Sequence, residues 1–441
     1  MAVHAKAKAA KVKTAKAKAA RAMAPSRADR VQQVVSPKGV AFWLVEDYAV
    51  PLVALEFALK GGAAQDPQGR AGAAAMLAAL LDEGAGKYDA QAFQQALDEK
   101  AIEISFNADR DAFSGRLKTL TRNTEAAFEF LALALNEARL DADPLERVRA
   151  QMVAGIRSEA NDPDALAGKA WRAAAFPGHP YGLPTHGSLD SVGAVTRGDL
   201  AAMREACFAR DTLKIAIVGA IDAATAAAMV DRAFAGLGAR ARMSPVAEIA
   251  VHGIGSRQVV DLDIPQATIR FGSAGIARKD PDHIAAVVIN HILGGGVFSA
   301  RLFKEVREKR GLAYSVHSSL NTYDRTSIFS GGTSTKNERA AESLRVIQDE
   351  IVGLSNGGPT DLELGEAKKY MIGSYALRFD TSTKIANQLV HLQMEGFGAD
   401  YLDERNGLIA AVTMKDARRV AKRLLGEGKM LVTVAGRPEG M

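Results

Sequence analysis

Cysteine is almost absent from this sequence, which has Cys207 as its single thiol in 441 residues. An internal disulfide is therefore excluded, and a lone thiol of this kind is more often a small core residue than a nucleophile. No apolar run approaches the ~20 residues that a membrane-spanning helix requires, so we expect no transmembrane segment. The 48% hydrophobic and 24% charged residues are typical of a globular chain, and the length allows two to four structural units.

Acidic residues are scarce at the N-terminus. Residues 1–30 hold six Lys and three Arg against one Asp, a net charge of +8, so the other 411 residues carry −3 of the total +5. This Lys/Ala-rich tract has no apolar segment of the kind found in secretory signals, and we expect a disordered tail. A weaker alternative is non-specific attraction of the tail to nucleic acid or anionic lipid. The mildly acidic body gives no reason to expect nucleic-acid binding.

An internal repeat organises the rest of the chain. Residues Ala194–Asp199 (AVTRGD) return as Ala411–Asp416 (AVTMKD) at an offset of 217, and each copy precedes an amphipathic helix and an apolar strand that ends in glycine. The same offset relates Leu145 to Leu362, each near the head of a long helical stretch. Coincidences at one offset indicate a tandem duplication.

The repeat sets the expected domains. We place the first at 31–237 and the second at 252–441, joined by a linker at 238–251. The linker lies within Gly236–Gly253, a stretch that contains GLGARARMSP and whose Gly, Arg and Pro residues suit an exposed connection. Apolar strand patterns at 40–45 and 50–59, followed by a helix at about 71–82, predict an α+β fold. Each half is expected to form an α/β-layered domain with an antiparallel-rich sheet covered by helices.

The second half carries the most distinctive motif, ILGGGVFSARLFKEVREKRGLAYSVHSS at 292–319. Its spacing predicts a helix over 299–309, capped by Gly311, and then a strand at 312–316. Arg307 on the last helical turn and Tyr314 on the strand are then able to converge. An Arg near a helix end also offsets the helix dipole, and a strand Tyr also packs, so the pair alone has a purely structural interpretation. The triple glycine lacks the GK[ST] of a phosphate loop.

This motif resembles the signature of the insulinase (pitrilysin-like) metallopeptidase family, which includes mitochondrial processing peptidase, complex III core proteins and bacterial two-chain peptidases. The opening strands, the FPGHPYG turn at 176–182, the AVTxxD repeats and the closing strands extend the resemblance over nearly everything after the tail. The resemblance implies two domains that form half of a clamshell chamber. It also implies that a matching Arg and Tyr donate hydrogen bonds to the substrate carbonyl that becomes an oxyanion, the role it gives Arg307 and Tyr314.

The zinc motif of the family is not found in this sequence. Active relatives carry HxxEH within a frame GxAHxxEHxxxxG, and here the frame glycines are Gly72 and Gly84. The resemblance aligns the two histidines and the glutamate with Ala75, Ala79 and Ala78, and the distal glutamate ligand with Gly155. Alanine and glycine have no metal-binding atoms in their side chains. None of the eight histidines forms HxxEH elsewhere, and we interpret His283 and His291 as structural.

Two functions remain open from the sequence. The first is the zinc-less subunit of a heterodimeric zinc metallopeptidase: a sister chain with HxxEH supplies zinc, this chain holds no cofactor, and Arg307 and Tyr314 act in trans on short or unfolded peptides. The second is an inert structural or peptide-binding subunit, as in the complex III core. The paired donors favour the first. A third function, an autonomous peptidase with an unusual metal site, is not supported, because the sequence shows no cluster of metal-ligand residues. The sequence does not assign a compartment. The resemblance allows the periplasm, and the alternative is the cytoplasm.

Overall fold

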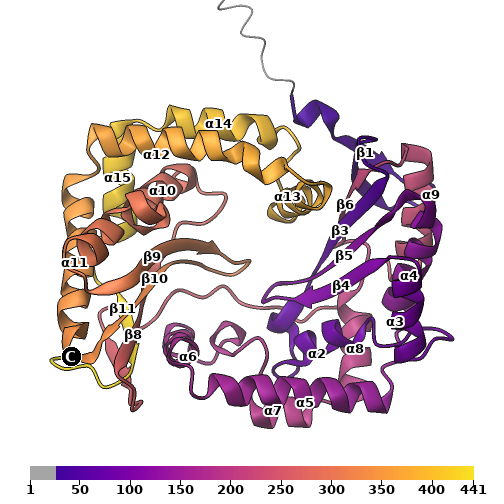
Figure 1. Ribbon diagram of the computed structural model, residues 1–441, viewed down its shortest axis with the longest axis horizontal. Coiled ribbons are helices and arrows are strands. Elements are labelled where there is room, and N and C mark those ends of the chain that lie inside the picture. The colour runs from indigo at the N-terminus through magenta and orange to yellow at the C-terminus, as the bar shows by residue number, and fades with distance from the viewer. Residues whose placement is uncertain (1–25) are drawn as a thin grey trace, which may run out of the picture.

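The computed structural model describes residues 26–441, and the fold consists of two facing halves. Figure 1 shows a β-sheet in each half, with helices on the outer side of each sheet and further helices bridging the halves at both ends. The chain therefore forms an arch around a central space, and the expected α+β class with two layered domains is confirmed.

The first sheet has six strands in the order β1-β2-β6-β3-β5-β4. Only the β2–β6 pair is parallel, so the sheet is mixed but mainly antiparallel. Strand β3 is buried along nearly its whole length, because helices cover both faces of the sheet there. The strands are β1 (Gln32–Val35), β2 (Ala41–Glu46), β3 (Leu52–Lys60), β4 (Glu103–Ala108), β5 (Ala112–Leu120) and β6 (Lys214–Gly219).

The second sheet has five strands in the order β7-β11-β8-β10-β9. Without β1, the two sheets share one topology, since in each the first, last, second, fourth and third strands follow one another across the sheet. The single parallel pair, β7–β11, also matches β2–β6. This identity agrees with the tandem duplication read from the sequence. The strands are β7 (Arg257–Val260), β8 (Gln266–Ala274), β9 (Ala313–Thr322), β10 (Ser327–Lys336) and β11 (Leu431–Ala435).

The helices of the first half pack around its sheet and along the lower rim of the arch in Figure 1. Helices α4 and α9 cover the outer face, where the largest apolar cluster of the chain lies. The helices are η1 (Ala28–Arg30), η2 (Gly62–Gln65), α2 (Ala73–Leu80), α3 (Ala90–Glu99), η3 (Thr121–Asn123), α4 (Thr124–Glu137), α5 (Ala142–Glu159), α6 (Pro163–Ala175), η4 (Pro180–Gly182), α7 (Leu189–Ala194), α8 (Arg197–Cys207) and α9 (Ala223–Phe234).

The helices of the second half repeat this plan. Helices α10, α11 and α15 cover the outer face of the second sheet. The helices are α10 (His283–Asn290), η5 (His291–Gly295), η6 (Val297–Ser299), η7 (Phe303–Glu308), η8 (Asn337–Arg339), α11 (Ala340–Gly357), α12 (Asp361–Gly373), η9 (Ser374–Phe379), α13 (Ser382–Glu395), α14 (Tyr401–Ala411) and α15 (Met414–Leu425).

The two AVTxxD repeats begin helices α8 and α15. In each, the repeat threonine accepts a hydrogen bond from the backbone N–H three residues later, and the aspartate there accepts one back, which forms a capping box. The boxes pair Thr196 with Asp199 and Thr413 with Asp416. The sequence repeat is therefore a duplicated helix start.

The inner face of each sheet is covered by a helix from the other half. Helix α6 of the first half packs on β8 and β11, and helix α13 of the second half packs on β3 and β6. These helices hold nearly the same place in the two copies of the repeat. Trp171 of α6 donates its indole N–H to the Leu431 carbonyl at 3.1 Å, and Gln393 of α13 donates to the Ile215 carbonyl at 3.0 Å. The halves are thus locked together by an exchange of helices.

The segment of chain before the first predicted domain, from Ser26 onward, and the predicted linker can both be followed in the structure. Most of the expected tail lies outside the described residues, but Ser26–Arg30 is held against the second half. The Asp403 carboxylate accepts bonds from the Ser26 hydroxyl and from the backbone N–H groups of Arg27 and Ala28. The last five residues of the expected tail, Ser26–Arg30, therefore include contacts with the second half. Residues 235–256, which include the expected linker, form no helix or strand.

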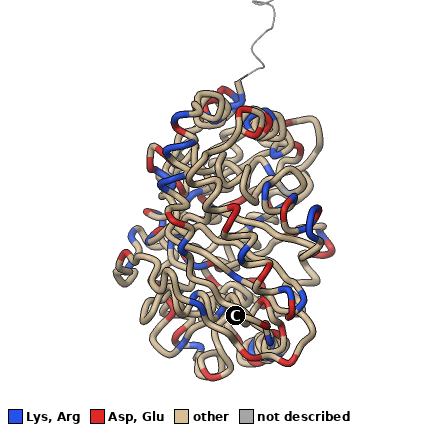
Figure 2. Tube along the Cα trace, turned by 90° about the vertical axis from the view of Figure 1, so that its left-hand side faces the viewer, with Lys and Arg blue, Asp and Glu red and all other residues tan. Residues whose placement is uncertain are grey.

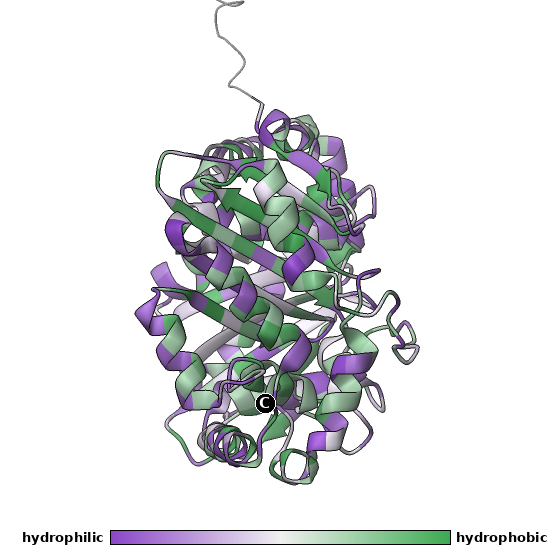
Figure 3. Ribbon diagram, turned by 90° about the vertical axis from the view of Figure 1, so that its right-hand side faces the viewer, coloured by the Kyte–Doolittle hydropathy of each residue, from purple (hydrophilic) through white to green (hydrophobic). Residues whose placement is uncertain are grey.

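The described surface mixes both signs of charge. On the face drawn in Figure 2, blue Lys and Arg segments alternate with red Asp and Glu segments. Figure 3 shows mainly hydrophobic strands beside helices that carry both hydrophilic and hydrophobic segments. Within residues 26–441, no helix is both long and apolar enough to cross a membrane.

Trp171 offers a test of the helix exchange. Its side chain is buried against Phe176, and a Cβ on Gly272 of β8 would lie 2.6 Å from its ring, so the glycine gives the indole room to lie on the sheet. We expect Trp171→Ala to lower the free energy of unfolding by about 3–5 kcal/mol, the usual cost of deleting a buried aromatic side chain. Denaturant unfolding measures it. Leu362→Ala, at a 74% exposed position, should change stability by no more than about 0.5 kcal/mol; equal losses would contradict the exchange as a major source of stability.

Candidate active site

Helix α2 keeps the local structure expected of a zinc-binding helix without its ligands. Gly72, at its N-cap, has φ +96°, and a Cβ there would lie 2.8 Å from the His186 carbonyl oxygen, so only glycine fits. The Asp66 carboxylate accepts bonds from the N–H groups of Gly72 and Ala74, at 2.7 and 2.8 Å. Burial raises the pKa of Asp66 to about 7 despite these bonds. Asp66 thus precedes the helix and binds the backbone of its first turn.

The four positions aligned with zinc chemistry lie on two helices that pack together, α2 and α5. Ala75 is half-buried and Ala79 is exposed, whereas Ala78 is buried. Gly155 of α5 is exposed, and a Cβ there would meet no atom within 4 Å. The donor set of three methyl groups and one hydrogen does not fit a zinc ion. Within residues 26–441, no three His, Cys, Asp or Glu side chains gather as a metal site.

Arg307 and Tyr314 come together in the second half. The Arg307 guanidinium carbon lies 4.8 Å from the centre of the Tyr314 ring and 4.7 Å from that of Phe303. Tyr314 is 83% exposed, so its hydroxyl is open to a bound molecule. The cation–π stack fixes the guanidinium beside the phenol. The structure therefore brings the two side chains into contact, while their role as hydrogen-bond donors to a substrate stays a prediction.

The helix that carries Arg307 is wound as a π-helix, which the sequence did not reveal. Residues Phe303–Glu308 follow two α-helical residues, and the Lys309 N–H donates to the Lys304 carbonyl five residues back. Gly311, with φ +58°, ends the segment, and its N–H donates to the Arg307 carbonyl at 3.0 Å. Single-turn π segments often occur at functional sites. The neighbouring Arg310 is held away by Glu305, whose carboxylate and carbonyl both accept from it.

The triple glycine precedes this helix and lies against strand β9. A Cβ on Gly294 would lie 2.5 Å from the Ser318 hydroxyl and 2.6 Å from the Ser318 nitrogen, so the backbone approaches β9 more closely than any other residue allows. The segment after it exposes Phe298, whose ring packs edge-on against Phe303 at 5.1 Å. Arg307 and Tyr314 thus extend a row of aromatic side chains.

The histidines predicted to be structural have local partners. The His283 ring is buried and lies 3.2 Å from the Ile276 carbonyl oxygen, and burial lowers its pKa. The His291 ring stacks on Tyr370 with centres 5.2 Å apart. His179 accepts a bond from the Tyr181 N–H within the FPGHPYG turn. Each imidazole is therefore occupied by packing or hydrogen bonding.

The two sets of predicted site residues lie in opposite halves of the arch. Helices α2 and α5 belong to the first half, whereas Arg307 and Tyr314 follow α10 in the second (Figure 1). Strands β4 and β9, at the edges of their sheets, each have one side without a neighbouring strand. Sequence reasoning did not identify β4 as an edge, although its alternating burial is the pattern of an open strand.

Comparisons with known proteins agree with this arrangement. The model of the insulinase family (peptidase family M16) matches residues 44–188, and that of the peptidase M16 inactive domain matches residues 194–371. The first match lies within the first half, and the second runs from the end of α7 through the 235–256 segment into α12 of the second half.

Individual relatives span most of their own length and of this chain. An uncharacterized zinc protease of Mycobacterium tuberculosis is 28% identical over 80% of this chain and 82% of that protein. A protein of Helicobacter pylori named a non-peptidase homolog is 27% identical over 78% and 79%. The crystal structure of a peptidase M16 inactive domain from Pseudomonas fluorescens has a TM-score of 0.85 at 28% identity and covers 92% of this chain and 98% of that one. A chain of complex III from Candida albicans, 18% identical over 93% and 96%, shares the fold (TM-score 0.74).

The degenerate positions generate a metal-binding prediction. We expect the purified chain to hold no stoichiometric zinc, because Ala75, Ala78, Ala79 and Gly155 offer no donor atoms. Metal analysis of the tag-free protein measures it, and one tightly bound zinc per chain would refute the alignment. The matched positive control is a single chain that combines Ala75→His, Ala78→Glu, Ala79→His and Gly155→Glu. Because Ala75 and Ala79 are accessible and Gly155 has open space around it, we expect that variant to bind one zinc.

Proposed function

This chain belongs to the peptidase M16 (insulinase) family, and we propose that it is the zinc-less subunit of a two-chain metallopeptidase to which it lends Arg307 and Tyr314. The observation that carries the proposal is the stack of the Arg307 guanidinium on the exposed Tyr314 ring, with centres 4.8 Å apart. Packing alone does not require a guanidinium to stack on a tyrosine that is open to solvent.

The chemistry of the pair suits a carbonyl that gains negative charge. Arg307 supplies a permanent positive charge with several N–H donors, and Tyr314 supplies one O–H donor. Donors fixed before the reaction stabilise an oxyanion without reorganising, and loss of one typically costs ~10²–10³ in rate. The sister chain with HxxEH would supply zinc and the attacking water, because the aligned positions of this chain do not fit the metal.

The peptide in this proposal binds as an added strand. Strand β4 ends its sheet with an open edge, and its residues alternate between exposed and half-buried positions. An extended peptide gains backbone hydrogen bonds from such an edge with little dependence on its sequence. Short or unfolded peptides are therefore the proposed substrate class.

A second candidate is an inert structural or peptide-binding subunit. The H. pylori relative named a non-peptidase homolog favours this function. The two candidates differ in what Arg307 and Tyr314 do, because an inert subunit needs neither donor at the carbonyl of a peptide.

Mixing with a co-purifying sister chain that carries HxxEH separates these candidates. We expect peptide hydrolysis that neither chain shows alone, and Tyr314→Phe should lower kcat by about 10²–10³ while KM changes little, because the hydroxyl acts mainly on charge present in the transition state. Arg307→Ala should lower kcat at least as much. Rates over a range of peptide concentrations measure both effects.

Arg310→Ala is the matched control, because Arg310 sits near the same helix end but is bound to Glu305. It should leave kcat within about twofold. Unchanged kcat in both test variants within an active complex would support the inert subunit. Size-exclusion chromatography measures complex formation. If the variants no longer form the complex, Arg307 and Tyr314 belong to an interface instead.

A further inference from the structure

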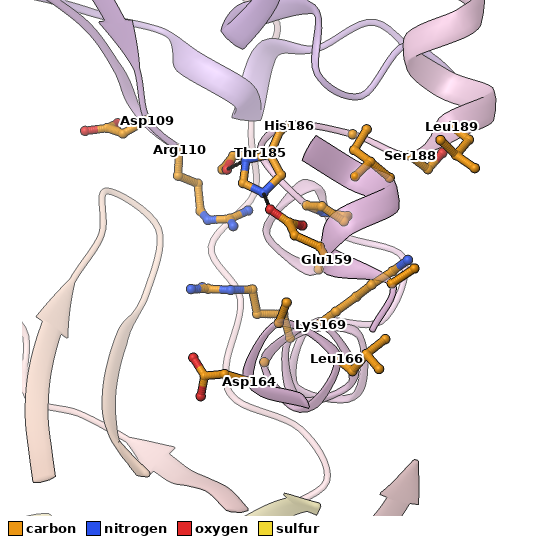
Figure 4. A pocket seen from close by; sticks show the side chains of 18 of the residues that line it. Asp109, Arg110, Glu159, Asp164, Leu166, Lys169, Thr185, His186, Ser188 and Leu189 are labelled. Atoms are coloured by element: carbon orange, nitrogen blue, oxygen red, sulfur yellow. Dashed lines mark hydrogen bonds and ion pairs between the residues drawn. The ribbon is translucent and has the colours of Figure 1, made fainter. Parts of the chain in front are cut away.

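A cavity of about 960 Å³ lies between the halves, at the end of edge strand β4. The tip of the β4–β5 hairpin forms one wall, helices α5 and α6 and the 182–190 loop form most of the rest, and the second half contributes Arg270 and Tyr323. Figure 4 shows Arg110 entering from the hairpin above α6, which carries Asp164 and Lys169. The cavity is thus built from parts far apart in the sequence, which is why no sequence motif marked it.

Several cations in this cavity have no carboxylate partner. Arg270 pairs with Asp164, and His186 lies 3.2 Å from Glu159 (Figure 4). Four more lining cations form no ion pair with any described residue: Arg110, Arg157, Lys169 and Arg172. With the other two lining carboxylates counted, five Lys and Arg side chains face four carboxylates, and the four unpaired cations still form no ion pair with them. An Asp109 oxygen accepts backbone bonds from Asp111 and Ala112 within its own turn, and Asp190 lies in the first turn of α7.

Among these cations, Arg110 gives the strongest evidence for an anionic ligand, because the residue is only 6% exposed. One of its terminal nitrogens donates to the carbonyls of Pro180 and Leu183, at 3.3 and 3.2 Å, and the guanidinium lies 5.5 Å from the Tyr181 ring centre. Burial and the nearby charge of Arg172 lower its pKa. The carboxylates of Asp66 and Asp111 act on Arg110 only through space, and neither pairs with it. A buried cation without a paired carboxylate is costly, so a ligand that brings negative charge would stabilise this arrangement.

We propose that the cavity binds a carboxylate of a peptide, held by Arg110 and Arg172. Asn107 and Ala108, the last residues of edge strand β4, line the cavity, so a peptide paired with β4 extends into it. A peptide parallel to β4 delivers its C-terminal carboxylate, and an antiparallel one delivers an acidic side chain. Guanidinium groups bind carboxylates through paired hydrogen bonds. The inference rests on the proposed function, in which the chain handles peptides.

Binding of defined peptides to the full chain tests the inference. The probes are fluorescein-labelled decapeptides of Ala, Ser and Gly: one with a free C-terminus, its C-terminal amide, and amides with one central Glu or Gln. Fluorescence anisotropy near 0.15 M salt gives each Kd. We expect either the free acid to bind about tenfold tighter than its amide, or the Glu peptide about tenfold tighter than the Gln peptide. The pair that differs identifies the source of the carboxylate. Equal binding within both pairs, or no binding at all, would overturn the inference.

Arg172→Gln is the test variant, because Arg172 is half-buried and makes no side-chain bond to a described residue, whereas Arg110 also holds the 180–183 turn. It should remove the carboxylate preference and leave the Kd of the amide peptide unchanged. Arg345→Gln, at an exposed site on α11, is the matched control and should keep the preference. A preference that survives Arg172→Gln would overturn the assignment.

These results stand apart from the test of catalysis in trans. A chain that prefers carboxylates but never supports hydrolysis would reject the catalytic role and keep the binding site. Hydrolysis in trans without a carboxylate preference would reject the binding site and keep the catalytic role.

Discussion

The exchange of α6 and α13 is the interaction on which the rest of the structure depends. Each sheet has an outer face covered by its own helices and an inner face covered by the other half's helix. An apolar sheet face left open to water would cost about 25 cal/mol for each Å² exposed. Neither half can therefore complete its core alone, and the edge strands, the Arg307–Tyr314 stack and the cavity are all positioned by this mutual packing.

The duplication could be predicted from the sequence because it is written in local signals. The AVTxxD repeats are capping boxes, and short-range capping rules apply to them regardless of the surrounding fold. The sheet to which α6 and α13 attach could not be predicted, since an amphipathic pattern shows that a face is buried but not what buries it. The docking of Ser26–Arg30 on Asp403 was missed for the same reason, because it joins residues more than 370 positions apart.

In the candidate site, too, some features could be predicted from the sequence and others could not. The seven-residue spacing of Arg307 and Tyr314 placed them together, since a helix end, a glycine and a strand lie in one short segment. The π-winding of Phe303–Glu308 has no clear sequence signal, because the same residues suit an ordinary α-helix. Helix α2 shows how zinc ligands can be absent while the fold is kept: alanine is the best helix former, and Asp66 and Gly72 still hold the first turn.

The locked arch also limits how the molecule can move. A hinge that spread the two halves would pull α6 and α13 off the sheets that they cover and break the bonds from Trp171 and Gln393 to the opposite strands. Domain closure in many enzymes uses a few hinge residues between units that share little packing, and this chain lacks that independence. A molecule that reaches the cavity beside β4 must therefore enter without the two halves hinging apart.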